Sequence, residues 1–292
     1  AGLSVSFIFS AGLAKSVGGF IMRDWGVSEM WMPFTTCCVF TLPLLIFLYL
    51  LDKVPPPTAL DESLRTRRQP MNAQERKKFI ATFFPGIVFF TLSYVLLTIF
   101  RDFRDNFSAE VWKSLGYGNS PEIFTTTEIP VSIIVLAVMG SLMMIKNNQR
   151  AFLINHLMVI VGMLLTGVST FLFQQQLIAA PVWMISIGLG LYLGYVPFNS
   201  IFFDRLLAAF QYVGTVGFLI YLADSFGYLG SVGVLFFKEF GYASLSWLDF
   251  FITAGYILSI AGSLLMTASL IYFKIRHRQL VADRALSPRE TT

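Results

Sequence analysis

The 292-residue chain is 55% hydrophobic and only 13% charged, and it carries a formal net charge of +4. Its apolar residues form blocks of about 20, the length that a helix needs to cross a hydrocarbon core, whereas a soluble domain would interrupt such blocks with polar faces. The basic residues lie between these blocks and after the last one, so membrane topology explains the charge better than binding to nucleic acid. The sequence therefore predicts an all-α, multi-pass bundle of transmembrane helices whose partner is membrane lipid.

Eight membrane spans are expected. They cover residues 1–22, 31–51, 79–100, 129–145, 151–173, 177–203, 212–237 and 250–273. The basic stretch 52–78 divides them into two and six. We expect residues 1–51 to be the last two helices of one half-bundle, 52–78 a cytoplasmic linker, 79–274 a six-helix half-bundle and 275–292 a cytoplasmic tail.

The distribution of basic residues predicts the orientation. If 52–78 is cytoplasmic, strict alternation places 146–150, 204–211 and the tail on the same side, together with most of the 21 Lys and Arg residues. The expected outer side keeps Arg23, Arg101, Arg104, Lys113 and Lys238. The positive-inside rule then places the C-terminus in the cytoplasm. Because the chain begins at Ala1 within an apolar run, we also expect the protein to extend further toward its N-terminus.

Three local patterns predict helix boundaries. Asn72 followed by Glu75 resembles a capping box, so the third span should begin as a helix before it enters the membrane. Residues 108–115 predict a short helix at the membrane interface. Thr127, Glu128 and Pro130 are typical of the capped first turn of the span 129–145.

Two apolar spans, a basic connection, six more spans and a basic tail resemble the major facilitator superfamily without its first four helices. Local segments are similar to an uncharacterised bacterial family allied to that superfamily: AGLSVSF at 1–7, LAKSVGG at 13–19, DKVPPP at 52–57, RRQPMNAQER at 67–76 and RDFRDN at 101–106. The resemblance implies a twelve-helix relative of transporters in the bacterial inner membrane, with 1–22 as the fifth helix and four further helices of the same chain as partners. It implies no substrate. The superfamily's cytoplasmic signature is largely missing, since Met144 stands in place of its aspartate and Asn147 in place of its second glycine.

Asp224 is the strongest single candidate for a functional residue. It lies at the midpoint of 212–237, where an acidic side chain costs about 2.5 to 3.5 kcal/mol. Tyr221 and Tyr228 share its helical face at spacings of three and four. These residues predict either a polar wall on a substrate or ion pathway, or a static hydrogen bond between helices.

The third and sixth spans supply further pathway candidates, which are Tyr94, Thr98 and Arg101 on the third and Tyr192, Tyr195 and Asn199 on the sixth. Pro197 predicts a kink, and the nearby Gly188, Gly190 and Gly194 fit either a cavity or close helix packing. The cluster of Arg101, Asp102, Arg104 and Asp105 is either a gate or a solvated network of ion pairs. Lys15 either extends toward the surface or pairs with a buried acid.

Neither a metal site nor a cofactor is expected. The chain has two histidines, and Cys37 and Cys38 are adjacent, without a second pair that could complete a zinc site. His156 is expected to form a hydrogen bond between helices. No P-loop, His-Glu-x-x-His or Gly-x-Ser-x-Gly motif is present, so an enzyme is not expected. The sequence favours a transporter that moves a small solute by alternating access, coupled to protons through Asp224. The alternatives are a membrane-embedded enzyme and a scaffold or sensor that transports nothing.

Overall fold

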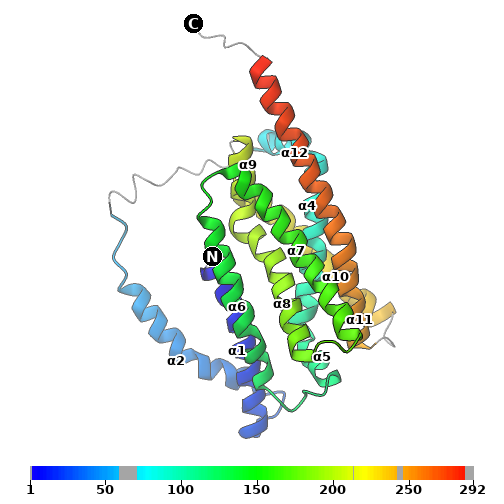
Figure 1. The fold of residues 1–292 in the computed structure, drawn as a ribbon. Coiled ribbons are helices and arrows are strands. Elements are labelled where there is room, and N and C mark those ends of the chain that lie inside the picture. The colour runs from blue at the N-terminus through cyan, green and yellow to red at the C-terminus, as the bar shows by residue number, and fades with distance from the viewer. Residues whose placement is uncertain (1, 59–70, 213, 242–245, 287–292) are drawn as a thin grey trace.

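The computed structural model describes residues 2–58, 71–212, 214–241 and 246–286, and all regular elements within these ranges are helices (Figure 1). In chain order they are α1 (Gly2–Asp24), α2 (Met32–Asp52), α4 (Ala73–Asn106), α5 (Ser108–Ser114), α6 (Glu122–Met143), α7 (Asn148–Gln174), α8 (Ala180–Pro197), η1 (Phe198–Phe202), α9 (Phe203–Phe210), α10 (Val216–Phe236), η2 (Phe237–Gly241), α11 (Trp247–Ile257), η3 (Leu258–Gly262) and α12 (Ser263–Leu286). The elements marked η are single wide π-helical turns that continue the helices beside them.

Seven segments of the described ranges are long and apolar enough to cross a membrane. They are Met32–Asp52, Ala73–Asn106, Glu122–Met143, Asn148–Gln174, Ala180–Phe210, Val216–Gly241 and Trp247–Leu280. The eight predicted spans correspond to these seven and to α1, which is helical over the first predicted span. The predicted all-helical membrane bundle is therefore confirmed. Most of the central basic linker, 59–70, and the tail residues 287–292 lie outside the described residues.

The bundle is built around α4, α7 and α8. Helix α4 packs against α10 and α12, α7 packs against α8, and α6 lies between α8 and α1. A large aromatic core joins α4, α8 and α12, and a second, smaller cluster joins α1, α6 and α8. Helix α2 contacts mainly α1, has no buried residue, and extends away from the other helices in Figure 1.

Helix α4 begins as predicted. The Asn72 side chain accepts a hydrogen bond from the Glu75 backbone N–H at 2.9 Å, and the Glu75 carboxylate accepts one from the Asn72 N–H at 2.8 Å. This is a complete capping box. A kink follows at Phe83, whose φ of −119° and ψ of 17° are not helical, two residues before Pro85.

Several predicted boundaries are wrong. The span expected to end at residue 203 continues through η1 and α9 to Phe210. Helix α4 does not end near residue 100 but continues to Asn106, so the residues placed in an outer loop belong to its last turns. Helix α6 begins at Glu122, directly after Pro121, rather than at a cap formed by Thr127 and Glu128. Pro130 lies inside α6. Pro121, which directly precedes the helix, explains the earlier start, because proline is well tolerated at the beginning of a helix.

The predicted short helix is confirmed as α5. Its Val111 and Trp112 are 1% and 2% exposed and belong to the main aromatic core, so this apolar side is covered by protein. At the same end of the bundle the Phe107 and Trp247 rings stack with centroids 4.0 Å apart. This packing joins the end of α4 to the start of α11.

Candidate functional site

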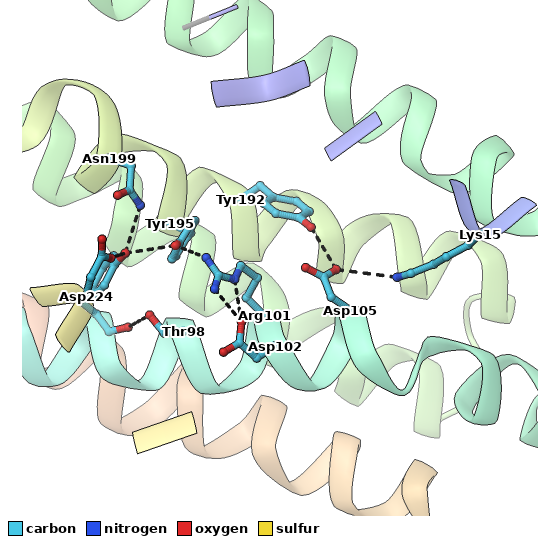
Figure 2. A network of polar contacts seen from close by, with 10 residues as sticks. Lys15, Thr98, Arg101, Asp102, Asp105, Tyr192, Tyr195, Asn199 and Asp224 are labelled. Atoms are coloured by element: carbon cyan, nitrogen blue, oxygen red, sulfur yellow. Dashed lines mark hydrogen bonds and ion pairs between the residues drawn. The ribbon is translucent and has the colours of Figure 1, made fainter. Parts of the chain in front are cut away.

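The two arginines of the charged cluster of α4 are buried, and its two acids are partly buried. Arg101 is 9% exposed and Arg104 only 3%, although the sequence pattern alone allowed a solvated ion-pair network. Arg101 donates hydrogen bonds to Asp102 Oδ1 from Nε at 3.0 Å and from Nη2 at 2.6 Å. Because α4 remains helical to Asn106, Arg104 and Asp105 follow about one turn further along the helix, and Figure 2 shows Asp105 directed toward Tyr192 and Lys15. Buried charges of this kind require partners.

A chain of hydrogen bonds joins three helices near the middle of the bundle (Figure 2). Arg101 of α4 bonds to the hydroxyl of Tyr195 on α8, which lies 3.1 Å from the hydroxyl of Tyr94 on α4. The Tyr94 hydroxyl in turn bonds to Asp224 of α10. We call these four residues, Arg101, Tyr195, Tyr94 and Asp224, the phenol chain. The structure therefore gives Asp224 a partner that is a phenol rather than a lysine.

The direction of the phenol chain follows from what each group can do. A guanidinium only donates, and an ionised carboxylate only accepts. Tyr94 must then donate its one proton to Asp224, so Tyr195 donates to Tyr94 while accepting from Arg101. Tyr94 also accepts a bond from Asn199 Nδ2 at 3.1 Å, which completes the capacity of its oxygen. With Asp224 ionised, every hydroxyl proton in the chain is used.

Local backbone structure brings Asn199 to the phenol chain. Pro197 ends α8, and the chain continues through the wide turn η1, which carries Asn199. A wider turn changes the direction of the side chains that follow it, and such turns are frequent at functional sites. The predicted disturbance at Pro197 is therefore present as a π-helical turn. The rings of Tyr94 and Tyr195 stack with centroids 5.3 Å apart and an interplanar angle of 18°.

A second group, which we call the ion-pair cluster, lies toward the α5 end of α4 and consists of Lys15, Arg104, Asp105 and Glu128 with Tyr192. Arg104 Nη2 lies 2.6 Å from Glu128 Oε1 of α6, and Lys15 Nζ lies 4.0 Å from Asp105 Oδ1. The Tyr192 hydroxyl donates to Asp105 Oδ1 at 3.4 Å. The structure thus pairs Lys15 with an acid rather than directing it to the surface.

Glycines make room for the ion-pair cluster and for Thr98. A Cβ on Gly188 of α8 would lie 2.9 Å from Arg104 Nη2, and one on Gly12 of α1 would lie 2.7 Å from Glu128 Cγ. On α10 a Cβ at Gly227 would lie 2.8 Å from the hydroxyl of Thr98. Thr98 itself donates to the backbone carbonyl of Tyr94 at 2.9 Å, so it shapes the helix rather than joining the phenol chain. Gly190 allows α8 to pack closely against α7.

The two tyrosines predicted beside Asp224 are placed differently from each other. Tyr228 is 50% exposed, and Arg101 lies 5.7 Å from the centre of its ring. Tyr221 is 74% exposed and belongs to neither group among the described residues. The buried face of α10 is the stripe Leu219, Ala223, Gly227 and Ser231. Asp224 lies at the edge of that stripe, and Tyr221 lies further around the helix. The helical face that the sequence assigned to both residues therefore does not place them in contact with the same groups.

Glu128 is the residue that sequence reasoning missed, because it was interpreted as a helix cap. Its Oε2 and the Nε of Arg104 are buried and have no hydrogen-bond partner. An acid within an apolar block was the available signal, the same signal that identified Asp224. It was hidden by the nearby threonines and Pro130, which imitate the start of a helix.

His156 of α7 has a structural environment. His156 is 0% exposed, and its Nε2 lies 3.2 Å from the hydroxyl of Ser269 on α12. Its Nδ1 lies 2.9 Å from the backbone carbonyl of Phe152. This is the predicted hydrogen bond between helices. Across the described ranges, no group of three or more His, Cys, Asp or Glu residues has metal-binding geometry.

Comparison with known proteins adds family membership. The search of curated proteins and the search of solved structures gave no match to this chain. A family model described as "Family of unknown function (DUF5690)" matches residues 1–276. The buried groups described above all lie within the matched residues. The chain, a multi-pass helical protein of membrane type, therefore belongs to the DUF5690 family.

Proposed function

We propose that this protein moves a small solute across the bacterial inner membrane by alternating access, and that proton binding at Asp224 is coupled to this movement. The observation that carries the proposal is the phenol chain, in which a carboxylate within one spanning helix is bonded through two hydroxyls to a buried arginine on another. Ionisable groups inside membrane helices are costly, and they commonly mark ion and substrate pathways.

Charge balance supports the proposal that Asp224 is the group that takes up the proton. Each of the three cations in the two groups has an acid as its ion-pair partner: Lys15 with Asp105, Arg101 with Asp102 and Arg104 with Glu128. Counted together with Asp102, the two groups hold four acids for three cations, and the partner of the fourth acid, Asp224, is the neutral Tyr94. A proton on Asp224 makes the two groups and Asp102 neutral together. A buried site without net charge has the smaller desolvation cost.

Protonation of Asp224 would change the far end of the phenol chain. A protonated carboxyl can donate to Tyr94, which then donates to Tyr195 instead of accepting from it. Tyr195 would accept from both sides, leaving its own proton without a partner in the chain. The bond from Arg101 to Tyr195 is therefore weaker in the protonated state, and Arg101 is released toward Asp102. Reversal of the hydrogen bond between Tyr94 and Tyr195 thus connects protonation of Asp224 on α10 with Arg101 on α4.

An ion pair between the expected half-bundles supports alternation between two conformations. Lys15 Nζ on α1 lies 4.0 Å from Asp105 Oδ1 on α4, so separation of the two halves breaks this contact, whereas their approach restores it. In the proposed orientation the ion-pair cluster closes the outer side, and the end of α12 lies in the cytoplasm. The resemblance to the major facilitator superfamily supports this mode of movement, with the solute site between half-bundles.

The test uses the purified full chain. Solutes are first screened for a rise in its melting temperature, because a ligand that binds only the folded state stabilises it. A stabilising solute is then offered to proteoliposomes with and without an inward proton gradient. We expect wild type to concentrate the solute only with the gradient, and Asp224→Asn to exchange the solute without concentrating it. Glu110→Gln, which removes an exposed acid of α5, should behave as wild type.

Two results would contradict the proposal. Accumulation by Asp224→Asn, or gradient-independent accumulation by wild type, excludes coupling through this carboxyl. Failure of every stabilising solute to cross the membrane excludes transport and favours a sensor or an enzyme.

A further inference from the structure

A pocket of about 290 Å³ lies at the end of the bundle opposite the ion-pair cluster. It is lined by the first turns of α7, the last turn of α9 and the last turns of α12. These are the three places that the basic-residue pattern assigns to one side of the membrane. Neither Asp224 nor the ion-pair cluster contributes to the pocket, so it is a separate site.

The floor of the pocket is apolar. Phe152 of α7, Phe210 of α9 and Phe273 of α12 meet there, with ring centroids 5.3 Å apart for Phe152 and Phe273 and 5.6 Å apart for Phe210 and Phe273. All three rings are buried in the main core. Such a floor accepts hydrocarbon and offers nothing to a fully hydrated ion.

The rim of the pocket is basic. Arg150, Lys274 and Arg278 line it, all three are exposed, and no acidic residue lines it. Within the described residues none of them forms an ion pair. Lys274 and Arg278 are four residues apart on one face of α12, the face that also carries Phe273. Gln149 and His277 connect the two sides of the rim, with Nε2 and Nδ1 2.7 Å apart.

The pocket opens onto apolar surface that runs along α7. Leu153 lines the pocket, and Leu157, Val161 and Leu164 follow it at helical spacing. These side chains are 37%, 46%, 58% and 45% exposed in chain order. They form a continuous apolar stripe from the pocket toward the middle of the bundle.

We propose that this pocket is a binding site for an anionic phospholipid. The headgroup phosphate lies among Arg150, Lys274 and Arg278, and the beginning of an acyl chain lies on the phenylalanine floor and continues along the stripe from Leu153. Basic pockets between membrane helices bind anionic headgroups in this manner. A free phosphate would leave the floor unused. A choline headgroup would bring a cation to a rim that has three.

The test measures melting temperature of the full chain in a non-ionic detergent against increasing concentrations of a short-chain phosphatidylglycerol. Phosphatidylcholine with the same chains and inorganic phosphate are the comparison probes. We expect phosphatidylglycerol to stabilise wild type, and the double variant Lys274→Gln, Arg278→Gln to bind it about 30-fold more weakly. The matched control is Lys77→Gln, Lys78→Gln, which removes two exposed charges from α4 outside the pocket and should bind as wild type.

A third variant separates the pocket from general attraction by charge. Ala209→Phe places a ring in the pocket without altering the charge, and it should abolish stabilisation by phosphatidylglycerol. The proposal is overturned if Ala209→Phe or the Lys274, Arg278 variant binds as wild type. Equal stabilisation by phosphatidylcholine excludes an anionic headgroup, and full stabilisation by inorganic phosphate alone excludes a lipid.

Discussion

Tyr94 is the residue on which the candidate site depends most. It is 1% exposed, and its hydroxyl contacts Asp224, Tyr195 and Asn199, which come from α10, α8 and η1. Each of these partners is a polar group inside the bundle. Loss of the Tyr94 hydroxyl oxygen therefore removes a hydrogen-bond partner from three polar groups. Leaving a buried polar group unpaired costs about 1 to 3 kcal/mol.

We therefore expect Tyr94→Phe to lower the free energy of unfolding by about 1 to 3 kcal/mol. The comparison is Tyr221→Phe, which removes the same atom from a side chain that is 74% exposed, and which should change stability by less than about 0.5 kcal/mol. Unfolding in mixed micelles measures both variants. Equal effects would mean that the phenol chain contributes no stability.

Most residues of the site could be predicted from the sequence, with Glu128 as the exception, but their pairings could not. Polar side chains in long apolar blocks identified Asp224, Tyr94 and Arg101, because each is expensive in lipid. Which of them meet depends on the rotation of each helix about its axis. Helix α10 shows the difficulty, since Asp224 reaches inward from the edge of its buried stripe while Tyr221, three residues earlier, is exposed.

At the scale of elements, the closest approach of one backbone to another at a described glycine is between α7 and α8. A Cβ on Gly162 would lie 2.4 Å from the carbonyl oxygen of Gly190, and one on Gly190 would lie 2.4 Å from that of Gly162. Small residues allow membrane helices to approach in this way and to gain van der Waals contact. The sequence left open whether Gly190 lines a cavity or packs a helix, and the structure places it in this contact.

We expect Gly162→Ala and Gly190→Ala each to destabilise the protein by about 1 to 3 kcal/mol, since a methyl group would force the two backbones apart. Gly140→Ala is the matched control, because a Cβ there meets nothing within 4 Å. Within a helix that change should stabilise by about 0.5 to 1 kcal/mol. Thermal unfolding of the three variants provides the measurement, and a neutral Gly162→Ala would contradict the contact.

The boundaries of elements were predicted less well than their existence. Long apolar blocks identify spans, but charged residues at the end of a block do not show where the helix stops. Helix α4 continues through Arg101 and Arg104 because Asp102 and Glu128 satisfy their charges inside the protein. Glu128 is distant from Arg104 in the sequence and resembles a capping residue, so only the packed bundle reveals this pair.

At the scale of the whole molecule, the two ends of the bundle differ in their charged residues. One end has α5, the ion-pair cluster and the start of α11, and the other has the basic pocket of α7, α9 and α12. The sequence predicted these groupings through alternation of the spans. The exposed helix α2 is the part whose place the apolar pattern alone did not indicate, since its whole surface is hydrophobic.

We expect the end with α5 to face outward. In a background without Cys37 and Cys38, Ser114→Cys on α5 should react with an impermeant thiol reagent in intact cells. Ser63→Cys in the linker and Ser287→Cys in the tail, both outside the described residues, should stay unlabelled until the cells are opened. Labelling of the linker together with protection of Ser114→Cys would reverse the orientation and remove the basis of the positive-inside argument.

The close contact of Gly162 with Gly190 also restricts how the molecule can move. Backbones this near cannot slide past one another without a collision, so we expect α7 and α8 to move together as one rigid unit. Relative motion must then occur where side chains rather than backbones meet, as between α8 and α4, whose contact includes the stacked rings of Tyr94 and Tyr195. Sliding of those rings past one another would break the hydrogen bond between the Tyr94 and Tyr195 hydroxyls. The presence of that bond would therefore distinguish the two arrangements of α4 and α8.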